Sequence, residues 1–159
     1  MELILWRHAD AEDETGAGDA ARRLTRKGRK QAERMAEWLK PRLEGEWRIV
    51  VSPAQRTLET IEPLGMPFEV SDAISTAGNA RTVLEEARWP DGDRVLVVGH
   101  QPTMGEVAAH LLGGGAGEVS VRKGAILWFA TRRRGAGEET VLKVVLDPEM
   151  LEAVEKGGK

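Results

Sequence analysis

Three short apolar runs constrain the fold of this chain more than any other feature. They are Leu3-Ile4-Leu5-Trp6, Ile49-Val50-Val51 and Val95-Leu96-Val97-Val98, and none of them alternates apolar with polar residues. A strand with one face in water shows that alternation, whereas a strand covered on both faces does not. The runs therefore predict strands in the middle of a parallel sheet that has helices on both sides.

Between and after these runs, apolar residues recur at helical spacing. Strands that alternate with helices of this length predict a three-layer α/β/α sandwich with a mostly parallel sheet. The helical stripes are Ala32, Met35, Ala36, Leu39 and Leu43, which Pro41 ends or kinks; Ala80, Val83, Leu84 and Ala87; and Met104, Val107, Ala108 and Leu111.

The C-terminal part has a different pattern. Apolar runs over 125–130 and 141–146 are separated by the Arg132-Arg133-Arg134-Gly135-Ala136-Gly137 segment. Two such runs predict an antiparallel hairpin, here with a long and loose connection. We therefore expect the sheet to be mixed.

Length and composition narrow the class of protein. The chain has 159 residues, which predicts one domain over 1–159. It contains no cysteine, which excludes disulfides, thiol catalysis and cysteine-ligated metals. Its net charge of −3 gives no reason to expect a nucleic-acid partner. Neither a signal peptide nor an apolar stretch of membrane-spanning length is found, so no membrane association and a cytoplasmic location are expected.

Chemistry-bearing residues follow each of the three apolar runs. The first run leads into Arg7-His8, the second into the 52–56 segment Ser-Pro-Ala-Gln-Arg, and the third into Gly99-His100. In open α/β sheets, ligands bind beyond the carboxyl ends of the strands. We therefore expect two arginines and two of the three histidines to meet in one basic pocket.

The 52–56 segment also carries a helix-start signal. Ser52 suits an N-cap, Pro53 suits the first helical position, and Gln55 completes a capping box. Arg56 then falls in the first helical turn. A helix N-terminus attracts anions and arginine matches the geometry of phosphate oxygens, so a phosphate site is predicted.

Taken alone, each of these features has an ordinary structural explanation. A histidine after a strand is more often a hydrogen-bonded structural residue, and Ser-Pro-x-x-Arg is a common helix start. His110 falls in the middle of a predicted helix, beside its apolar stripe, and we expect it on the surface. The basic run from Arg22 to Arg34 predicts a solvated helix face, with a docking surface for an acidic partner as the alternative.

Together, the motifs resemble the histidine phosphatase superfamily, which has the phosphoglycerate mutase-like fold. Leu5-Trp6-Arg7-His8 resembles its Arg-His-Gly signature, and Leu24-Thr25-Arg26-Lys27-Gly28 its Leu-Thr-x-x-Gly helix start. The segment from Ser52 to Thr60 is similar to its Ser-Pro-x-x-Arg-x-x-x-Thr motif, and Val97-Val98-Gly99-His100 to its second-histidine motif. The short chain and the Arg-His-x-Asp-Ala opening look most like the phosphohistidine phosphatase (SixA) branch.

The resemblance implies a role for each residue. His8 is expected to be the catalytic nucleophile and to become phosphohistidine, while Arg7, Arg56 and His100 hold the phosphoryl oxygens. Asp19 and Arg22 fall where the SixA branch has a similar pair, which implies that Arg22 also touches the substrate. Neither a metal nor another cofactor is implied.

Two positions depart from the family pattern. Ala9 stands where the family has glycine, which indicates ordinary backbone angles or a slightly altered pocket. Family members that act on phosphate esters use a carboxylic acid to protonate the leaving group, and the aligned position here is Ala73. Its neighbour Asp72 is expected to point elsewhere, because successive side chains of an extended backbone face opposite ways.

The missing acid itself favours one class of substrate. An ester releases an alkoxide and benefits from a positioned acid, whereas phosphohistidine releases an imidazole that can be protonated beforehand. Only 44 positions (100 − 56) separate Arg56 from His100, which leaves no room for a large lid. We therefore expect a metal-independent phosphatase that removes phosphate from phosphohistidine on a signalling protein. The alternatives are a phosphatase or mutase for small phosphorylated molecules, and a phosphate-binding module without catalysis.

Overall fold

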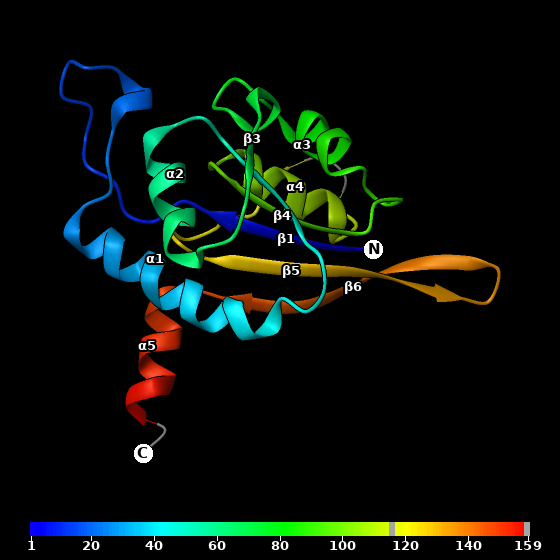
Figure 1. The fold of residues 1–159 in the computed structure, drawn as a ribbon. Helices are drawn as coiled ribbons and strands as arrows, with labels where there is room; N and C mark the ends of the chain where they lie inside the picture. The colour runs from blue at the N-terminus through cyan, green and yellow to red at the C-terminus, as the bar shows by residue number, and fades with distance from the viewer. Residues whose placement is uncertain (115–116, 158–159) are drawn as a thin grey trace.

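The computed structural model describes residues 1–114 and 117–157, so four positions of the predicted 1–159 domain lie outside the described residues. Its centre is one six-stranded sheet with the strand order β3-β2-β4-β1-β5-β6 (Figure 1). The strands are β1 (Glu2–Arg7), β2 (Arg48–Val51), β3 (Glu69–Val70), β4 (Arg94–Gly99), β5 (Ile126–Arg134) and β6 (Gly137–Leu146).

The sheet is mixed, as the sequence predicts. β1 pairs with β4, β4 with β2, and β2 with β3, all in parallel. β5 pairs antiparallel with both β1 and β6. The three predicted central strands are confirmed as β1, β2 and β4. β3 was not predicted from the sequence, because its two residues are both exposed and form no apolar run.

Helices cover both faces of the sheet, which confirms the three-layer α/β/α sandwich (Figure 1). α1 ends two residues before Pro41, and that proline lies in the 3₁₀ turn Lys40–Arg42 that follows. No helix within the described ranges is long and apolar enough to span a bilayer. The helices are α1 (Arg26–Leu39), α2 (Gln55–Ile61), α3 (Ala80–Ala87), α4 (Thr103–Leu111) and α5 (Pro148–Gly157).

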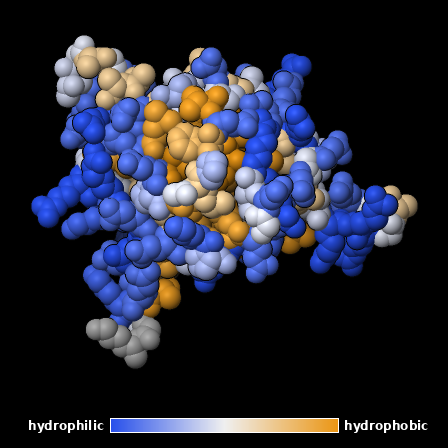
Figure 2. All heavy atoms as spheres, in the orientation of Figure 1, coloured by the Kyte–Doolittle hydropathy of each residue, from blue (hydrophilic) through white to orange (hydrophobic). Residues whose placement is uncertain are grey.

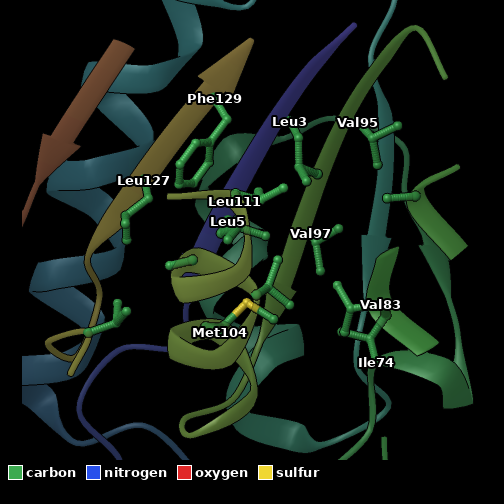
Figure 3. Packing of buried hydrophobic residues seen from close by; sticks show 14 of the residues in the cluster. Leu3, Leu5, Ile74, Val83, Val95, Val97, Met104, Leu111, Leu127 and Phe129 are labelled. Carbon is green, nitrogen blue, oxygen red and sulfur yellow. The ribbon is translucent and has the colours of Figure 1, made fainter. Parts of the chain in front are cut away.

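The two-sided covering explains why the central strands do not alternate. In β1, Leu3 and Leu5 face the layer of α3 and α4, where they pack with Met104 (Figure 3). Ile4 and Trp6 face the opposite layer, which contains α1, α2 and α5. These four central side chains of β1 are fully buried, so each position has to be apolar whichever face its side chain points to.

The C-terminal hairpin differs from the expected loose connection. β5 runs on to Arg134 and β6 begins at Gly137, which leaves a two-residue turn. Gly135 has a φ of +61°, and tight two-residue turns need such left-handed residues. The predicted loop is therefore strand for most of its length, and Arg132 and Glu139 form an ion pair across it. In Figure 1 the hairpin projects beyond the other strands.

A close contact joins the start of α1 to the segment that follows β1. Thr25 caps α1, and its hydroxyl accepts a hydrogen bond from the Gly28 amide at 3.0 Å. The Thr25 amide donates to the Asp10 carbonyl, also at 3.0 Å. A Cβ on Gly28 would stand 1.9 Å from that carbonyl oxygen, so only glycine fits at this position.

We expect Gly28→Ala to lower the free energy of unfolding by about 2 kcal/mol, because the new methyl group meets backbone that cannot move aside cheaply. Urea denaturation measures the loss. Gly137→Ala is the matched control, since the nearest atom to its Cβ lies at 3.8 Å, and it should change stability by less than about 0.5 kcal/mol. Equal stability of both variants would contradict the close contact.

Candidate active site

The carboxyl ends of β1, β4 and β2 bring the predicted residues together. The parallel register places Arg7 opposite Gly99 and Val51 opposite Val98. Backbone hydrogen bonds continue this pairing one residue further, from the His8 amide to the Gly99 carbonyl at 3.0 Å and from the Ser52 amide to the Val98 carbonyl at 3.1 Å. His8, Ser52 and His100 are therefore neighbours at one edge of the sheet.

His8 is held in a defined orientation. Its Nδ1 lies 2.7 Å from the Ala9 carbonyl oxygen. A carbonyl oxygen only accepts hydrogen bonds, so Nδ1 carries the proton and, in the neutral ring, Nε2 keeps a free lone pair. The His8 and His100 rings lie 5.4 Å apart, centroid to centroid. This geometry makes Nε2 available as a nucleophile.

Both imidazoles are buried and uncharged at neutral pH. Burial, together with the charges of His100, Arg56 and Arg7, lowers the pKa of His8 to about 3 against the opposing effect of the Ala9 carbonyl. Burial and the neighbouring Arg56 likewise lower the pKa of His100 to about 4. The nucleophilic form of His8 is thus present without a general base.

His100 is fixed through both ring nitrogens. Its Nε2 lies 2.7 Å from the Ser52 hydroxyl, and its Nδ1 accepts from Arg56 Nη2 at 3.3 Å. Arg56 therefore stands on the Nδ1 side of the ring and Ser52 on the Nε2 side. While Nδ1 accepts from Arg56, the proton of the neutral ring lies on Nε2, which donates to the Ser52 hydroxyl. Donation from Nδ1 to an oxyanion on the Arg56 side requires the other tautomer, in which the Ser52 hydroxyl donates to Nε2.

The predicted helix start at Ser52 is wrong. α2 begins at Gln55, its N-cap is Ala54, and no side chain caps it. Gln55 donates to Glu59 at 2.8 Å instead of completing a capping box. The physical reason is that the parallel sheet places the Ser52 hydroxyl beside His100. Arg56 remains in the first turn of α2, as predicted.

The two predicted phosphate-binding arginines share an unusual feature. Among the described residues, the buried side-chain polar atoms without a hydrogen-bond partner are Nε of Arg7 and Nε of Arg56. Arg7 Nη1 donates to the Val121 carbonyl, and Arg56 Nη1 donates to the Asp19 carbonyl at 2.8 Å. A buried N–H without an acceptor is costly, so each arginine has a donor that an anion can satisfy.

Asp19 and Arg22, the pair that the resemblance singles out, lie beside Arg56. The Asp19 carboxylate is 3.0 Å from Arg56 Nη2 and 3.2 Å from Arg22 Nη1. These bonds, together with the two arginine charges, hold the pKa of Asp19 below its usual range, although its partial burial acts the other way. Asp19 is therefore ionised at neutral pH and orients Arg56.

The residues at the aligned acid position offer no buried carboxylic acid. Ala73 lies in a 3₁₀ turn, Asp72–Ile74, capped by the Ser71 hydroxyl. Asp72 is exposed, whereas His8 and His100 are buried. The acid that is missing from the sequence at this position is therefore not supplied by the neighbouring Asp72 in the structure either.

Ala9 fits its position without strain. It does not have a positive φ, and its side chain is fully buried against Leu24 and Ala32. Its amide donates to the Thr60 hydroxyl at 3.1 Å, and that hydroxyl also donates to the Arg56 carbonyl. Thr60 thus connects the His8 segment to α2. The signal for this role was its i+4 spacing from Arg56, which places both on one helix face.

The remaining predicted residues lie elsewhere. His110 is exposed in the last turn of α4, as expected. In the basic run, Arg23 and Arg29 form ion pairs with Glu59, which is 6% exposed. Within the described ranges, no three His, Asp or Glu side chains form a cluster suited to a metal ion.

Comparisons with known proteins agree with this geometry. The family model described as histidine phosphatase superfamily (branch 1) matches residues 3–78, a segment that contains His8 and Arg56. The phosphohistidine phosphatase SixA homolog of Haemophilus influenzae is 34% identical over 129 residues, covering 71% of this chain and 78% of the relative. SixA of Escherichia coli is 32% identical over 123 residues, with 72% and 76% covered.

A solved structure of the protein histidine phosphatase SixA, complexed with tungstate, superposes with a TM-score of 0.77. It is 27% identical and the match covers 95% of this chain and 99% of that one. Fold, site and relatives together define a phosphatase, a hydrolase of phosphorylated substrates. The chain belongs to the histidine phosphatase superfamily, and within it resembles the SixA branch.

We expect His8 and His100 to remain neutral at pH 5.5, with the His8 proton on Nδ1. The ¹⁵N chemical shifts of the imidazole rings measure both properties. In the unfolded chain, histidine protonates near pH ~6.5, so between that pH and about 4 the unfolded state binds more protons than the folded state. Stability should therefore fall as the pH is lowered through this window. Imidazolium shifts for either residue at pH 5.5 would contradict the burial argument.

Ser52→Ala should slow turnover about tenfold, because the buried His100 Nε2 loses its partner at a cost of roughly 1.4 kcal/mol. Steady-state kinetics measures the rate, and the ¹⁵N shifts of His100 report the change in its hydrogen bonding. An unchanged rate with unchanged His100 shifts would contradict a positioning role for Ser52.

Proposed function

We propose that the protein is a metal-independent phosphohistidine phosphatase that acts through a phosphorylated His8. The observation that carries this proposal is the pair of unpartnered, buried Nε–H donors of Arg7 and Arg56 beside a neutral and oriented His8. Two such donors suit the oxygens of a phosphoryl group, whose charge is spread over several atoms. In this proposal cationic side chains supply the charge stabilisation.

In the first step, His8 Nε2 attacks phosphorus. The new N–P bond forms as the bond from phosphorus to the leaving group breaks, while Arg7, Arg56 and His100 hold the phosphoryl oxygens. Phosphoryl transfer depends mainly on positioning and on stabilising charge, which these residues provide. The Nδ1 bond to the Ala9 carbonyl stabilises the positive charge that develops on the His8 ring.

In the second step, water attacks the phosphorylated His8. The N–P bond breaks, inorganic phosphate leaves, and His8 returns to its neutral form. Splitting hydrolysis into two displacements is the general advantage of covalent catalysis. Both steps use the same phosphate-binding residues.

The chemistry around the leaving group favours phosphohistidine over esters. Ala73 supplies no proton, and Asp72 is exposed. An imidazole protonated on its other nitrogen leaves as a neutral molecule, so it needs no acid at that position. Alkyl phosphates, which release an alkoxide, would react slowly at such a site.

The relatives support this substrate class. Those from Haemophilus influenzae and Escherichia coli are named as phosphohistidine phosphatases. The solved SixA structure holds tungstate, a tetrahedral oxyanion like phosphate. By similarity, we propose that this chain removes phosphate from phosphohistidine on a protein, with a signalling protein as its physiological substrate.

A labelling experiment tests the mechanism. Incubation with a ³²P-phosphohistidine peptide followed by rapid quenching should give label on His8 that is stable in base and lost in acid. His8→Ala should lose the label and reduce phosphate release by about a thousandfold or more. His110→Ala, which removes the one histidine of the three that lies outside the site, should behave as the unmodified protein.

The same assay separates the alternatives. Equal phosphate release by the His8→Ala variant would overturn the covalent mechanism. Faster hydrolysis of p-nitrophenyl phosphate or sugar phosphates than of the peptide would favour a small-molecule phosphatase. Phosphate binding without turnover would favour a binding module.

A further inference from the structure

A groove of about 980 Å³ begins at Arg7 and runs between α1, α5 and the segment before β5. We call it the α1 groove and define it by Arg7 at one end and by Arg26, Lys27, Lys30 and Arg34 along α1. Seven cationic and four acidic side chains line it, although the whole chain has a net charge of −3. In Figure 2, hydrophilic side chains gather over the start of α1, at the left of the view.

Each acidic side chain of the groove has a cationic partner. Asp10 pairs with Lys123 at 2.8 Å, and Glu152 pairs with Lys156 at 2.9 Å. Asp147 and Glu149 both pair with Arg122, at 3.5 and 2.8 Å. The excess positive charge of the groove therefore lies on α1.

Three α1 cations have no such partner. Arg26, Lys27 and Lys30 are exposed and form no ion pair with any of the residues in 1–114 and 117–157. Arg34, by contrast, pairs with Glu155 at 2.8 Å. An anionic partner would thus meet three unpaired cations in the groove that Arg7 also lines.

The placement of these cations does not help α1 to form. Arg26 and Lys27 occupy the first turn, where the helix dipole favours acidic residues and none is present. Arg26 and Lys30 are four residues apart, and like charges at that spacing repel each other on the helix surface. An acidic partner would relieve both effects.

Arg7 lines the α1 groove and directly precedes His8 of the candidate active site. The cations from Arg26 to Arg34 extend over about 12 Å of helix, at about 1.5 Å per residue. A protein that presents phosphohistidine to His8 would place its neighbouring residues along this groove. Among the described residues, no aromatic side chain lines the groove, so they do not provide the stacking that single-stranded nucleic acids use.

We propose that the α1 groove docks an acidic surface that flanks the phosphohistidine of a protein substrate. The proposal rests on the proposed function and adds the chemistry of the partner to it. Arg26, Lys27 and Lys30 select the partner by charge, whereas Arg7 and the two histidines act on the phosphoryl group.

The test compares two phosphohistidine peptides that differ only in their flanks, glutamate in one and glutamine in the other. At low salt, kcat/KM should be about tenfold higher for the glutamate peptide, and the preference should shrink at high salt because exposed charges are screened. The triple variant R26E/K27E/K30E should lose the preference but hydrolyse free phosphohistidine at the unmodified rate. Acidic residues suit the first turn of α1, so this variant should fold.

A matched control carries the same change in net charge elsewhere. Lys40, Arg81 and Arg133 are exposed and lie outside the groove. The variant K40E/R81E/R133E should keep the preference for the glutamate peptide. If the control variant also loses the preference for the glutamate peptide, net charge and not the α1 groove selects the partner, and the proposal is overturned.

Anisotropy of a fluorescent glutamate peptide without phosphate separates docking from catalysis. Binding that R26E/K27E/K30E loses, without turnover of any phosphohistidine, would support the docking surface and overturn the proposed function. Turnover of both peptides at equal rates, with no binding of the glutamate peptide, would support the proposed function and overturn the docking surface. Equally tight binding of single-stranded DNA of the same charge would also overturn the assignment of an acidic protein partner.

Discussion

The parallel pairing of β1 with β4 is the constraint on which the candidate site depends. Its register sets Arg7 opposite Gly99, and the His8 amide then bonds to the Gly99 carbonyl. Two imidazoles that are 92 positions apart (100 − 8) in the chain thereby come within 5.4 Å of each other. Apolar packing on both faces of the sheet keeps this register, because a slip by one residue would exchange the two buried faces of the strand.

Burial then gives the two histidines their chemical character. Burial, with the charges of the neighbouring arginines, lowers the pKa of His8 to about 3 and that of His100 to about 4, so each is neutral where an exposed histidine would be partly charged. The positive charge of the site stays on the arginines. Backbone carbonyls and Asp19 hold those arginines, and one Nε–H on each remains without an acceptor. A neutral imidazole beside fixed cations suits the phosphoryl transfer that we propose.

The sequence predicted the fold class and the meeting of Arg7, His8, Arg56 and His100, because apolar periodicity and the carboxyl ends of parallel strands follow general rules. It was wrong about Ser52 and about the hairpin loop. Ser52 has the composition of a helix cap, but its hydroxyl bonds to a residue 48 positions away. The hairpin turn depends on one left-handed glycine, Gly135, which a string of arginines and glycines does not single out.

The sequence by itself determined which residue types end each central strand, since local apolar runs mark where those strands lie. Only the tertiary structure decided how the side chains share their hydrogen bonds. Ser52 contacts His100, and Asp19 orients Arg56. Glu59 pairs with Arg23 and Arg29, whereas Lys27 and Lys30 form no ion pair within the part of the chain that the structure describes. The physical reason is that each of these choices depends on distances between segments that the sheet, and not the local chain, brings together.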